Sequence, residues 1–362
     1  MPSQKIQNPG DRLRLVAWEL TRKCNLNCAH CRAGSERGPY KGELDTAKCL
    51  EILGQIASVG KPIVILTGGE PLLRDDVFYL ARQGTEKGLR MVMATNGTLL
   101  TPDIIEQMKT SGIKRVSVSI DGCDEEQHYR LRKVPGAFDR ALRGIRLLKK
   151  GEMEFQINTT ITRQNYRDVE KILNMSVELG AMAHHLFLLV PTGRARQMED
   201  QEIDALQYEQ LLHWFYGMRD KVPLHLKATC APHYYRIMRQ EAHKRGEKVT
   251  LETYGLDAVT RGCLGGTSFC FISNIGVVQP CGYLELDCGD LKEASFQSVW
   301  SGSDVFNQLR DFSAYKGKCG RCEYLRFCGG CRARAFESTG DFLGEEPLCS
   351  YQPGAKPDGK RA

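Results

Sequence analysis

The sequence predicts an α/β protein with a parallel sheet, followed by a small cysteine-rich domain, and three observations support this. Short apolar runs alternate with helix-like patterns through the first two hundred residues, as expected for strands joined by crossover helices. The length of 362 residues suits two or three domains. Twelve of the 15 cysteines gather near the two ends of the chain, and the second region is expected to need bound metal to fold.

Six strand–helix units account for the first region. The expected strands are 15–20, 62–66, 90–94, 115–120, 154–160 and 184–190. The expected helices are 46–59, 75–87, 102–111, 137–149 and 166–179. Asp45 and Thr101 are suited to cap helix starts, and glycines such as Gly60 and Gly180 follow helix ends. Such units form either part of a barrel or an open wound sheet, and the pattern alone does not choose between them.

The domain boundaries follow from changes in pattern. We expect the barrel-like region over 1–200, a bridging helical segment over 201–256, a cysteine-rich domain over 257–352 and a flexible tail over 353–362. Leu211, Leu212 and Phe215 mark an amphipathic helix in the bridge. From Cys263 onward short strands and turns dominate, without a hydrophobic core of their own.

Composition excludes several classes of function. The chain has 50 Lys plus Arg against 44 Asp plus Glu, and the basic residues are scattered, which disfavours nucleic-acid binding. We find no apolar run of the roughly 18 residues that a membrane span needs, and no secretory signal at the N-terminus. We therefore expect a cytoplasmic protein whose thiols stay reduced, so that its cysteines serve metal or cluster ligation or redox chemistry.

Residues that could bind a ligand or take part in catalysis follow successive strands. The first strand is followed by Cys24, Cys28 and Cys31, and the second by a Gly-Gly-Glu-Pro run at 68–71. Asn96-Gly97 and Asp121-Gly122 follow the third and fourth strands; each pair alone is also consistent with an ordinary turn. Because the carboxyl ends of parallel strands meet at one edge, these loops are expected to form one ligand site.

The three N-terminal cysteines have three and then two residues between them. Three thiolates from one loop can bind three irons of a 4Fe–4S cluster and leave the fourth iron open for a ligand. The alternative is a zinc site in which His30 supplies the fourth ligand.

This triad, followed by the Gly-Gly-Glu-Pro loop, resembles the radical S-adenosylmethionine (SAM) enzymes. The resemblance implies a partial (β/α)6 TIM-like barrel, a catalytic 4Fe–4S cluster and SAM as co-substrate. In that family the reduced cluster cleaves SAM to methionine and a 5′-deoxyadenosyl radical. The resemblance also implies SAM contacts, namely backbone approach at Gly68 and Gly69, an amino-group contact from Glu70, an adenine contact near Val190, and further contacts at Pro71, Asn96, Ser119, Asp121 and Arg132.

The C-terminal cysteines resemble the SPASM extension of radical SAM enzymes, which carries auxiliary 4Fe–4S clusters. The resemblance implies one auxiliary cluster on Cys319, Cys322, Cys328 and Cys349, and a second on Cys263, Cys281 and Cys331 with Cys270 as a candidate fourth ligand. Only two residues separate Cys328 from Cys331, where the family usually has three, and a zinc ribbon is the alternative for the two CxxC pairs. Cys288 has no assigned role, and Cys49, Cys123 and Cys230 are expected to be ordinary thiols.

Longer runs, including ILTGGEPLLR and QPCGYLELDCGDL, resemble the heme synthases of the siroheme-dependent heme pathway. This implies radical oxidative decarboxylation of two propionates of iron-coproporphyrin III to vinyls, giving heme b, with an unidentified low-potential electron donor. The anionic porphyrin suits a basic pocket, for which the candidates are Arg194, Arg196, Arg332 and Arg334. The alternatives are a related enzyme of heme d1 biosynthesis and a SPASM enzyme that matures a peptide or protein.

Overall fold

The computed structural model describes residues 13–354, and a single sheet organises it. The strands are β1 (Leu15–Glu19), β2 (Ile63–Thr67), β3 (Arg90–Thr95), β4 (Val116–Ser119), β5 (Phe155–Ile161), β6 (Ala183–Leu188), β7 (His225–Thr229), β8 (Phe269–Ile272), β9 (Val277–Gln279) and β10 (Gly289–Asp290). Their order in the sheet is β10-β9-β8-β1-β2-β3-β4-β5-β6-β7. The run from β8 to β7 is parallel throughout, and β9 and β10 extend its other edge as antiparallel strands.

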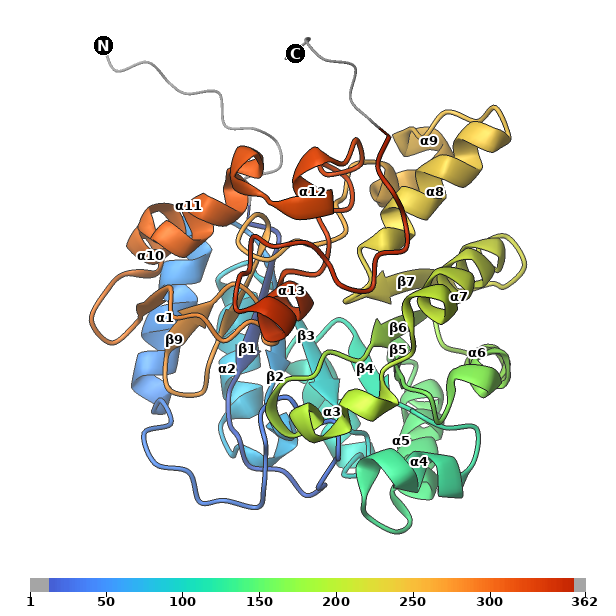
Figure 1. Ribbon diagram of the computed structural model, residues 1–362. Helices are drawn as coiled ribbons and strands as arrows, with labels where there is room; N and C mark the ends of the chain where they lie inside the picture. The colour runs from blue at the N-terminus through green and yellow to red at the C-terminus, as the bar shows by residue number, and fades with distance from the viewer. Residues whose placement is uncertain (1–12, 355–362) are drawn as a thin grey trace.

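Helices connect the strands and cover the sheet, as Figure 1 shows. The α-helices are α1 (Thr46–Val59), α2 (Val77–Glu86), α3 (Pro102–Thr110), α4 (Glu125–Arg132), α5 (Ala137–Lys150), α6 (Val169–Leu179), α7 (Ala205–Gly217), α8 (His233–Lys244), α9 (Leu251–Tyr254), α10 (Phe296–Gly302), α11 (Asp304–Arg310), α12 (Gly317–Arg321) and α13 (Arg332–Thr339). The 3-10 helices are η2 (Pro71–Leu73), η3 (Tyr166–Asp168), η4 (Gly193–Gln201), η5 (Gly255–Ala258) and η6 (Phe312–Ala314). Among them, α1, α3 and α4 begin at a side-chain cap, from Asp45, Thr101 and Asp124.

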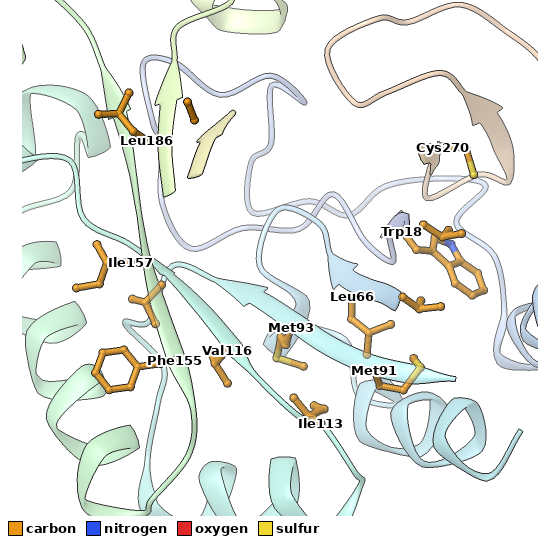
Figure 2. Close-up of a cluster of buried hydrophobic side chains, with 14 of the residues drawn as sticks. Trp18, Leu66, Met91, Met93, Ile113, Val116, Phe155, Ile157, Leu186 and Cys270 are labelled. Carbon is orange, nitrogen blue, oxygen red and sulfur yellow. The ribbon is translucent and has the colours of Figure 1, made fainter. Parts of the chain in front are cut away.

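The main hydrophobic core lies between the sheet and its helices. Alternate strand residues such as Trp18, Leu66 and Met93 point into it (Figure 2). Ile52 of α1 and Ile145 of α5 belong to the same core and are fully buried. The other strand residues face the opposite side of the sheet and are only half-buried, as the alternating pattern of β2 and β4 shows. That second face therefore has room for a pocket.

The α/β fold with a parallel sheet is confirmed, and the six predicted strands appear as β1 to β6. Two pairings differ from the sequence expectation. Strand β7 lies in the segment expected to be a helical bridge, and β8 of the cysteine-rich region pairs with β1. Ile272, Phe296 and Trp300 consequently join the main core, whereas we had expected no hydrophobic core there. The predicted tail 353–362 lies outside the described residues except for 353 and 354.

Candidate active site and cluster sites

A pocket opens at the carboxyl ends of the parallel strands. All three cysteines of the N-terminal loop line it, together with side chains at the ends of β2 to β6, namely Thr67, Ala94, Ser119, Asn158, Thr160 and Phe187. The sequence placed the site at this edge, and the structure brings Cys24, Cys28 and Cys31 together with Asn96, Ser119 and Arg132 in one cavity.

The loop carrying the three thiols is arranged for a thiolate-bound group. Each sulfur has a nearby N–H donor: Leu26 N lies 3.4 Å from Cys24 Sγ, Ser35 N lies 3.3 Å from Cys31 Sγ, and Arg132 Nη1 lies 3.6 Å from Cys28 Sγ. Such donors stabilise sulfur that carries negative charge in an iron–sulfur site. Burial raises the pKa of Cys24 to about 12, so its thiolate needs a bound cation. The donor set of soft thiolates fits a 4Fe–4S cluster.

A single metal ion fits this region less well. Among residues 13–354, no group of three or more His, Cys, Asp or Glu side chains is close enough to hold one ion. A zinc ion needs every sulfur within about 2.3 Å, whereas a cubane spreads its thiolates over different irons. His30 Nε2 lies 3.6 Å from Asp121 Oδ2, and His30 does not form a three-ligand group with the thiols of the described residues. The zinc alternative with His30 therefore finds no support in the geometry.

The two glycines after β2 allow the cysteine loop to approach closely. A Cβ at Gly68 would lie 2.4 Å from the carbonyl oxygen of Thr21, and one at Gly69 would lie 2.4 Å from that of Lys23. The amide of Gly69 donates to Thr21 O at 2.7 Å, and that of Glu70 donates to Lys23 O at 2.8 Å. Here the glycines are needed where two stretches of backbone meet, and these contacts fix the start of the cysteine loop.

Glu70 and Pro71, the next two residues of this loop, are both buried. The Glu70 carboxylate is fully buried and accepts hydrogen bonds from Thr95 Oγ1, the Asn96 amide and the Leu72 amide at 2.7, 2.8 and 3.2 Å. Burial raises its pKa to about 7, against the effect of these three donors. Pro71 begins η2 and is buried. Because its carboxylate is occupied in this way, Glu70 joins the second loop to the third and does not line the pocket.

A buried ion pair stands behind the thiols. Arg132, at the end of α4, pairs with Asp121 at 2.6 Å, and Asp121 also accepts from the Thr160 amide at 2.8 Å. The Arg132 guanidinium keeps the pKa of Asp121 below its ordinary value in spite of burial. Asn96 donates to Asn25 at 2.8 Å and thereby ties the third loop to the cysteine loop. These residues orient the loop and leave Arg132 at the pocket wall.

Of the four candidate pocket arginines, only Arg194 lines the cavity. Its Nε and Nη1 donate to Cys28 O and Ser35 O at 2.9 and 3.0 Å, while its buried Nη2 has no partner within the described chain. The other three candidates have partners elsewhere: Arg196 pairs with Glu337 at the surface, Arg332 donates to the carbonyls of Phe342 and Gly344, and Arg334 donates to the carbonyl of Leu189.

Val190 was expected to lie beside adenine, and the structure shows where its side chain packs. It is 2% exposed, does not line the pocket, and packs with Leu284, Cys331 and Ala333 of the C-terminal region. The segment after β6 thus serves as a contact between the barrel and the cysteine-rich part. Sequence reasoning placed it correctly at the strand end but could not foresee which side it faces.

Four C-terminal cysteines surround a second cavity, as the resemblance implied. Its lining includes Cys319, Cys322, Cys328 and Cys349, with Arg236 beside them. Arg332 Nη2 and the Glu346 amide lie 3.5 and 3.4 Å from Cys319 Sγ, which again suits sulfur in a cluster. We call these four residues the outer cysteine set.

Two glycines explain how Cys328 and Cys331 can belong to different groups although only two residues separate them. Gly329 and Gly330 both have positive φ, 77° and 60°, which glycine adopts without strain. They turn the chain so that Cys328 lines the outer cavity while Cys331 packs in a separate cluster of side chains. The short spacing that departs from the family pattern is therefore accommodated by backbone conformation.

Cys331 belongs to a group of thiols nearer the barrel. Cys281 and Cys230 pack against it, and the electrostatic neighbours of Cys281 are Cys263 and Cys331. The candidate ligand Cys270 is elsewhere: it is fully buried in the main core, and its electrostatic neighbours are Cys288 and Arg310. Cys230, expected to be an ordinary thiol, lies with this group. We call Cys230, Cys263, Cys281 and Cys331 the inner thiols.

Tyr283 was not predicted, yet it lines the pocket from the C-terminal side. Its electrostatic neighbours are Arg32 and the thiols of Cys31, Cys230 and Cys281. Tyr283 thus stands between the N-terminal loop and the inner thiols. Its position two residues after Cys281, in a run without helix or strand pattern, was the only signal in the sequence.

Comparison with known proteins agrees with this arrangement. A model of the radical SAM superfamily matches residues 18–176, and a model of the SPASM iron–sulfur cluster-binding domain matches 263–331. The structure of Streptococcus suis SuiB bound to S-adenosylmethionine is similar, with a TM-score of 0.75 over 94% of this chain and 78% of that chain at 17% identity.

Two curated relatives are informative. The AdoMet-dependent heme synthase of Methanosarcina barkeri is 53% identical over 95% of this chain and 98% of its own length. The pre-heme d1 synthase of Dinoroseobacter shibae is 31% identical over 92% of this chain and 85% of its own. No helix among residues 13–354 is long and apolar enough to cross a membrane. The chain belongs to the radical SAM superfamily and, within it, to the SPASM-containing family of the AdoMet-dependent heme synthases.

Proposed function

We propose that this protein converts iron-coproporphyrin III to heme b by oxidative decarboxylation of two propionates to vinyls, with SAM as co-substrate. One observation carries the proposal beyond the family: a single pocket has the three-cysteine loop on one wall and Tyr283, backed by the inner thiols, on another. The higher identity to the heme synthase than to the pre-heme d1 synthase supports this substrate over a heme d1 precursor.

The chain's own residues would divide the work as follows. Cys24, Cys28 and Cys31 would hold the catalytic 4Fe–4S cluster, and the outer cysteine set would hold an auxiliary one. When bound, the catalytic cluster supplies the electron that cleaves SAM. Asn96, Ser119 and Arg132, which line the pocket beside the loop, would bind SAM there.

Arg194 would bind a carboxylate. Its Nη2 is buried, lacks a partner within the described residues and belongs to a pocket-lining side chain. An unsatisfied guanidinium N–H is costly to bury, and a carboxylate is the acceptor that suits it best. Both the methionine part of SAM and the substrate propionates carry one, and separate Michaelis constants for the two ligands distinguish them.

The chemistry of vinyl formation fits a pocket with two cysteine-lined sides. Removal of a hydrogen atom from the propionate β-carbon leaves a carbon radical; loss of carbon dioxide then forms the double bond and releases one electron. That electron needs an acceptor near the pocket, and the inner thiols that would hold one lie behind Tyr283. We place the reaction in the cytoplasm, where thiols stay reduced, with a low-potential electron donor yet to be identified.

The test is anaerobic incubation of the reconstituted protein with reductant, SAM and iron-coproporphyrin III. We expect heme b, preceded by a monovinyl porphyrin, together with 5′-deoxyadenosine and methionine. Formation of deoxyadenosine while both propionates stay intact would contradict the substrate assignment. A heme d1 precursor or a peptide converted in place of this porphyrin would do the same.

A further inference from the structure

The inner thiols form a group of four, and the fourth member comes from a part of the chain outside the SPASM match at 263–331. Cys230 directly follows β7. It packs with Cys281 and Cys331 in one side-chain cluster. The segment before Cys263 is also close: a Cβ on Gly262 would lie 2.6 Å from Pro232 Cα, two residues beyond Cys230.

The backbone at Cys230 is held in an unusual conformation. Its φ is 55°, in the left-handed region that non-glycine residues rarely adopt. Its carbonyl accepts from Tyr208 Oη at 3.0 Å and from Arg334 Nη1 at 3.3 Å. A strained conformation persists when surrounding structure enforces it, and such positions cluster at functional sites. Here α7 and α13 together fix the residue beside the inner thiols.

The thiols are arranged as ligands of a cluster and not of one ion. Cys230 packs in the same side-chain cluster as Cys281 and Cys331, and Cys263 is close enough to interact with it electrostatically. Within residues 13–354 no three such donors are close enough to hold a single metal ion. Four buried or half-buried thiols that lie together, with no three of them close enough for one zinc ion, match the ligand set of a 4Fe–4S cubane.

Cys270 lacks each of these features. It lies on β8 opposite Val16 of β1, and its side chain is in the main core near Trp18 (Figure 2). Its electrostatic neighbours are Cys288 and Arg310, not the inner thiols. A strand residue whose side chain faces the helix layer cannot reach the opposite side of the sheet.

From this geometry we propose that Cys230, with Cys263, Cys281 and Cys331, ligates an inner auxiliary 4Fe–4S cluster in place of Cys270. Four cysteine ligands close the cluster, so no iron is open to the porphyrin. These four residues would thereby hold a cluster that could supply an electron acceptor near the pocket without itself binding the porphyrin. This last role rests on the proposed function, whereas the ligand assignment does not.

The test compares Cys230→Ala with Cys270→Ala in the full-length protein after anaerobic reconstitution. The readouts are iron and sulfide per chain, together with Mössbauer and EPR spectra of the reduced protein. We expect Cys230→Ala either to lose about four irons per chain or to show an altered spectrum for one cluster. Cys270→Ala should keep the parent's iron content and spectra.

One further variant keeps the assignment open to contradiction. Cys230→Ser replaces sulfur by a poorer iron ligand of similar size, so a folded protein with one altered cluster spectrum is expected. Parent-like spectra in both Cys230 variants, loss of a cluster in Cys270→Ala, or zinc bound in place of iron would overturn the proposal. Because none of these readouts involves porphyrin, failure of the proposed function would be seen separately, as unchanged porphyrin in a protein with all clusters present.

Discussion

The two cysteine-bearing regions are built in opposite ways. The N-terminal loop supplies three thiols within eight residues, and all three line a pocket that is shared with five strand ends. The C-terminal thiols come from separate segments: the outer set closes around its own cavity, and the inner group joins residues from 230 to 331. A local loop leaves an open coordination position for chemistry, whereas assembly from distant segments suits closed sites that store or pass electrons.

The largest difference between the two regions is expected in SAM cleavage. Replacing Cys24, Cys28 and Cys31 by alanine should abolish deoxyadenosine formation and remove about four irons per chain, because the cluster that cleaves SAM has no other ligands. Cys319→Ala should disturb the outer auxiliary cluster while SAM cleavage continues. Deoxyadenosine assays and iron analysis check both variants. SAM cleavage by the triple variant would contradict the division of roles.

The next largest effect concerns the ion pair that braces the open site. Arg132→Gln leaves the buried Asp121 carboxylate without its main partner, which should cost about 3–5 kcal/mol of unfolding free energy. Arg130→Gln, which removes an exposed pair with Glu126 on the same helix, should change stability by less than about 0.5 kcal/mol. Denaturant titration measures both. Equal effects would mean that the buried pair does not stabilise the loop.

A smaller effect is expected where the second loop meets the cysteine loop. Gly69→Ala forces a Cβ against two backbone carbonyls, those of Lys23 and Arg22. It should lower the free energy of unfolding by about 1–3 kcal/mol and reduce the amount of catalytic cluster that the protein binds. Gly54→Ala is the control, because a Cβ there meets no atom within 4 Å and the residue lies inside α1. Gly54→Ala should raise the free energy of unfolding by roughly 0.5–1 kcal/mol. A stable, fully loaded Gly69→Ala variant would show that the close approach is not required.

The smallest effect concerns the carboxylate site. Arg194→Lys keeps the charge but loses the planar fork, so one Michaelis constant should rise about tenfold, roughly 1.4 kcal/mol. Arg196→Lys, at an exposed pair with Glu337, should leave both constants unchanged. A rise for SAM alone places Arg194 at the methionine carboxylate, and a rise for the porphyrin alone places it at a propionate. If neither Michaelis constant rises, Arg194 does not bind the carboxylate of either ligand.

Local patterns allowed much of this structure to be predicted. The N-terminal cysteine loop and strands β1 to β6 follow from spacing and alternation within short stretches of sequence, whereas the outer set was implied by the resemblance to SPASM proteins. Non-local features were missed. The β7 sequence, His-Leu-Lys-Ala-Thr, has little apolar character, and pairing with β6 decides its conformation. The side that Val190 faces and the partners of Glu70 likewise depend on contacts across the fold, which a single sequence does not specify.

Cys230 shows the same limit most clearly. It has no neighbouring cysteine and lies 33 positions before Cys263, so spacing gave no reason to assign it. It lies directly after β7, but that strand was not predicted, so its place at a strand end could not be seen in the sequence. Cys270 was named as a candidate fourth ligand, yet its strand position directs it into the core.

The central claim is that the pocket shared by the two regions couples SAM cleavage to loss of propionate carboxyl groups. The most direct measurement is the ratio of deoxyadenosine to carbon dioxide to heme in an anaerobic reaction limited by iron-coproporphyrin III. The account predicts two deoxyadenosines and two carbon dioxides for each heme formed, passing through a monovinyl intermediate. Deoxyadenosine released without matching carbon dioxide, or carbon dioxide released without vinyl groups, would contradict it.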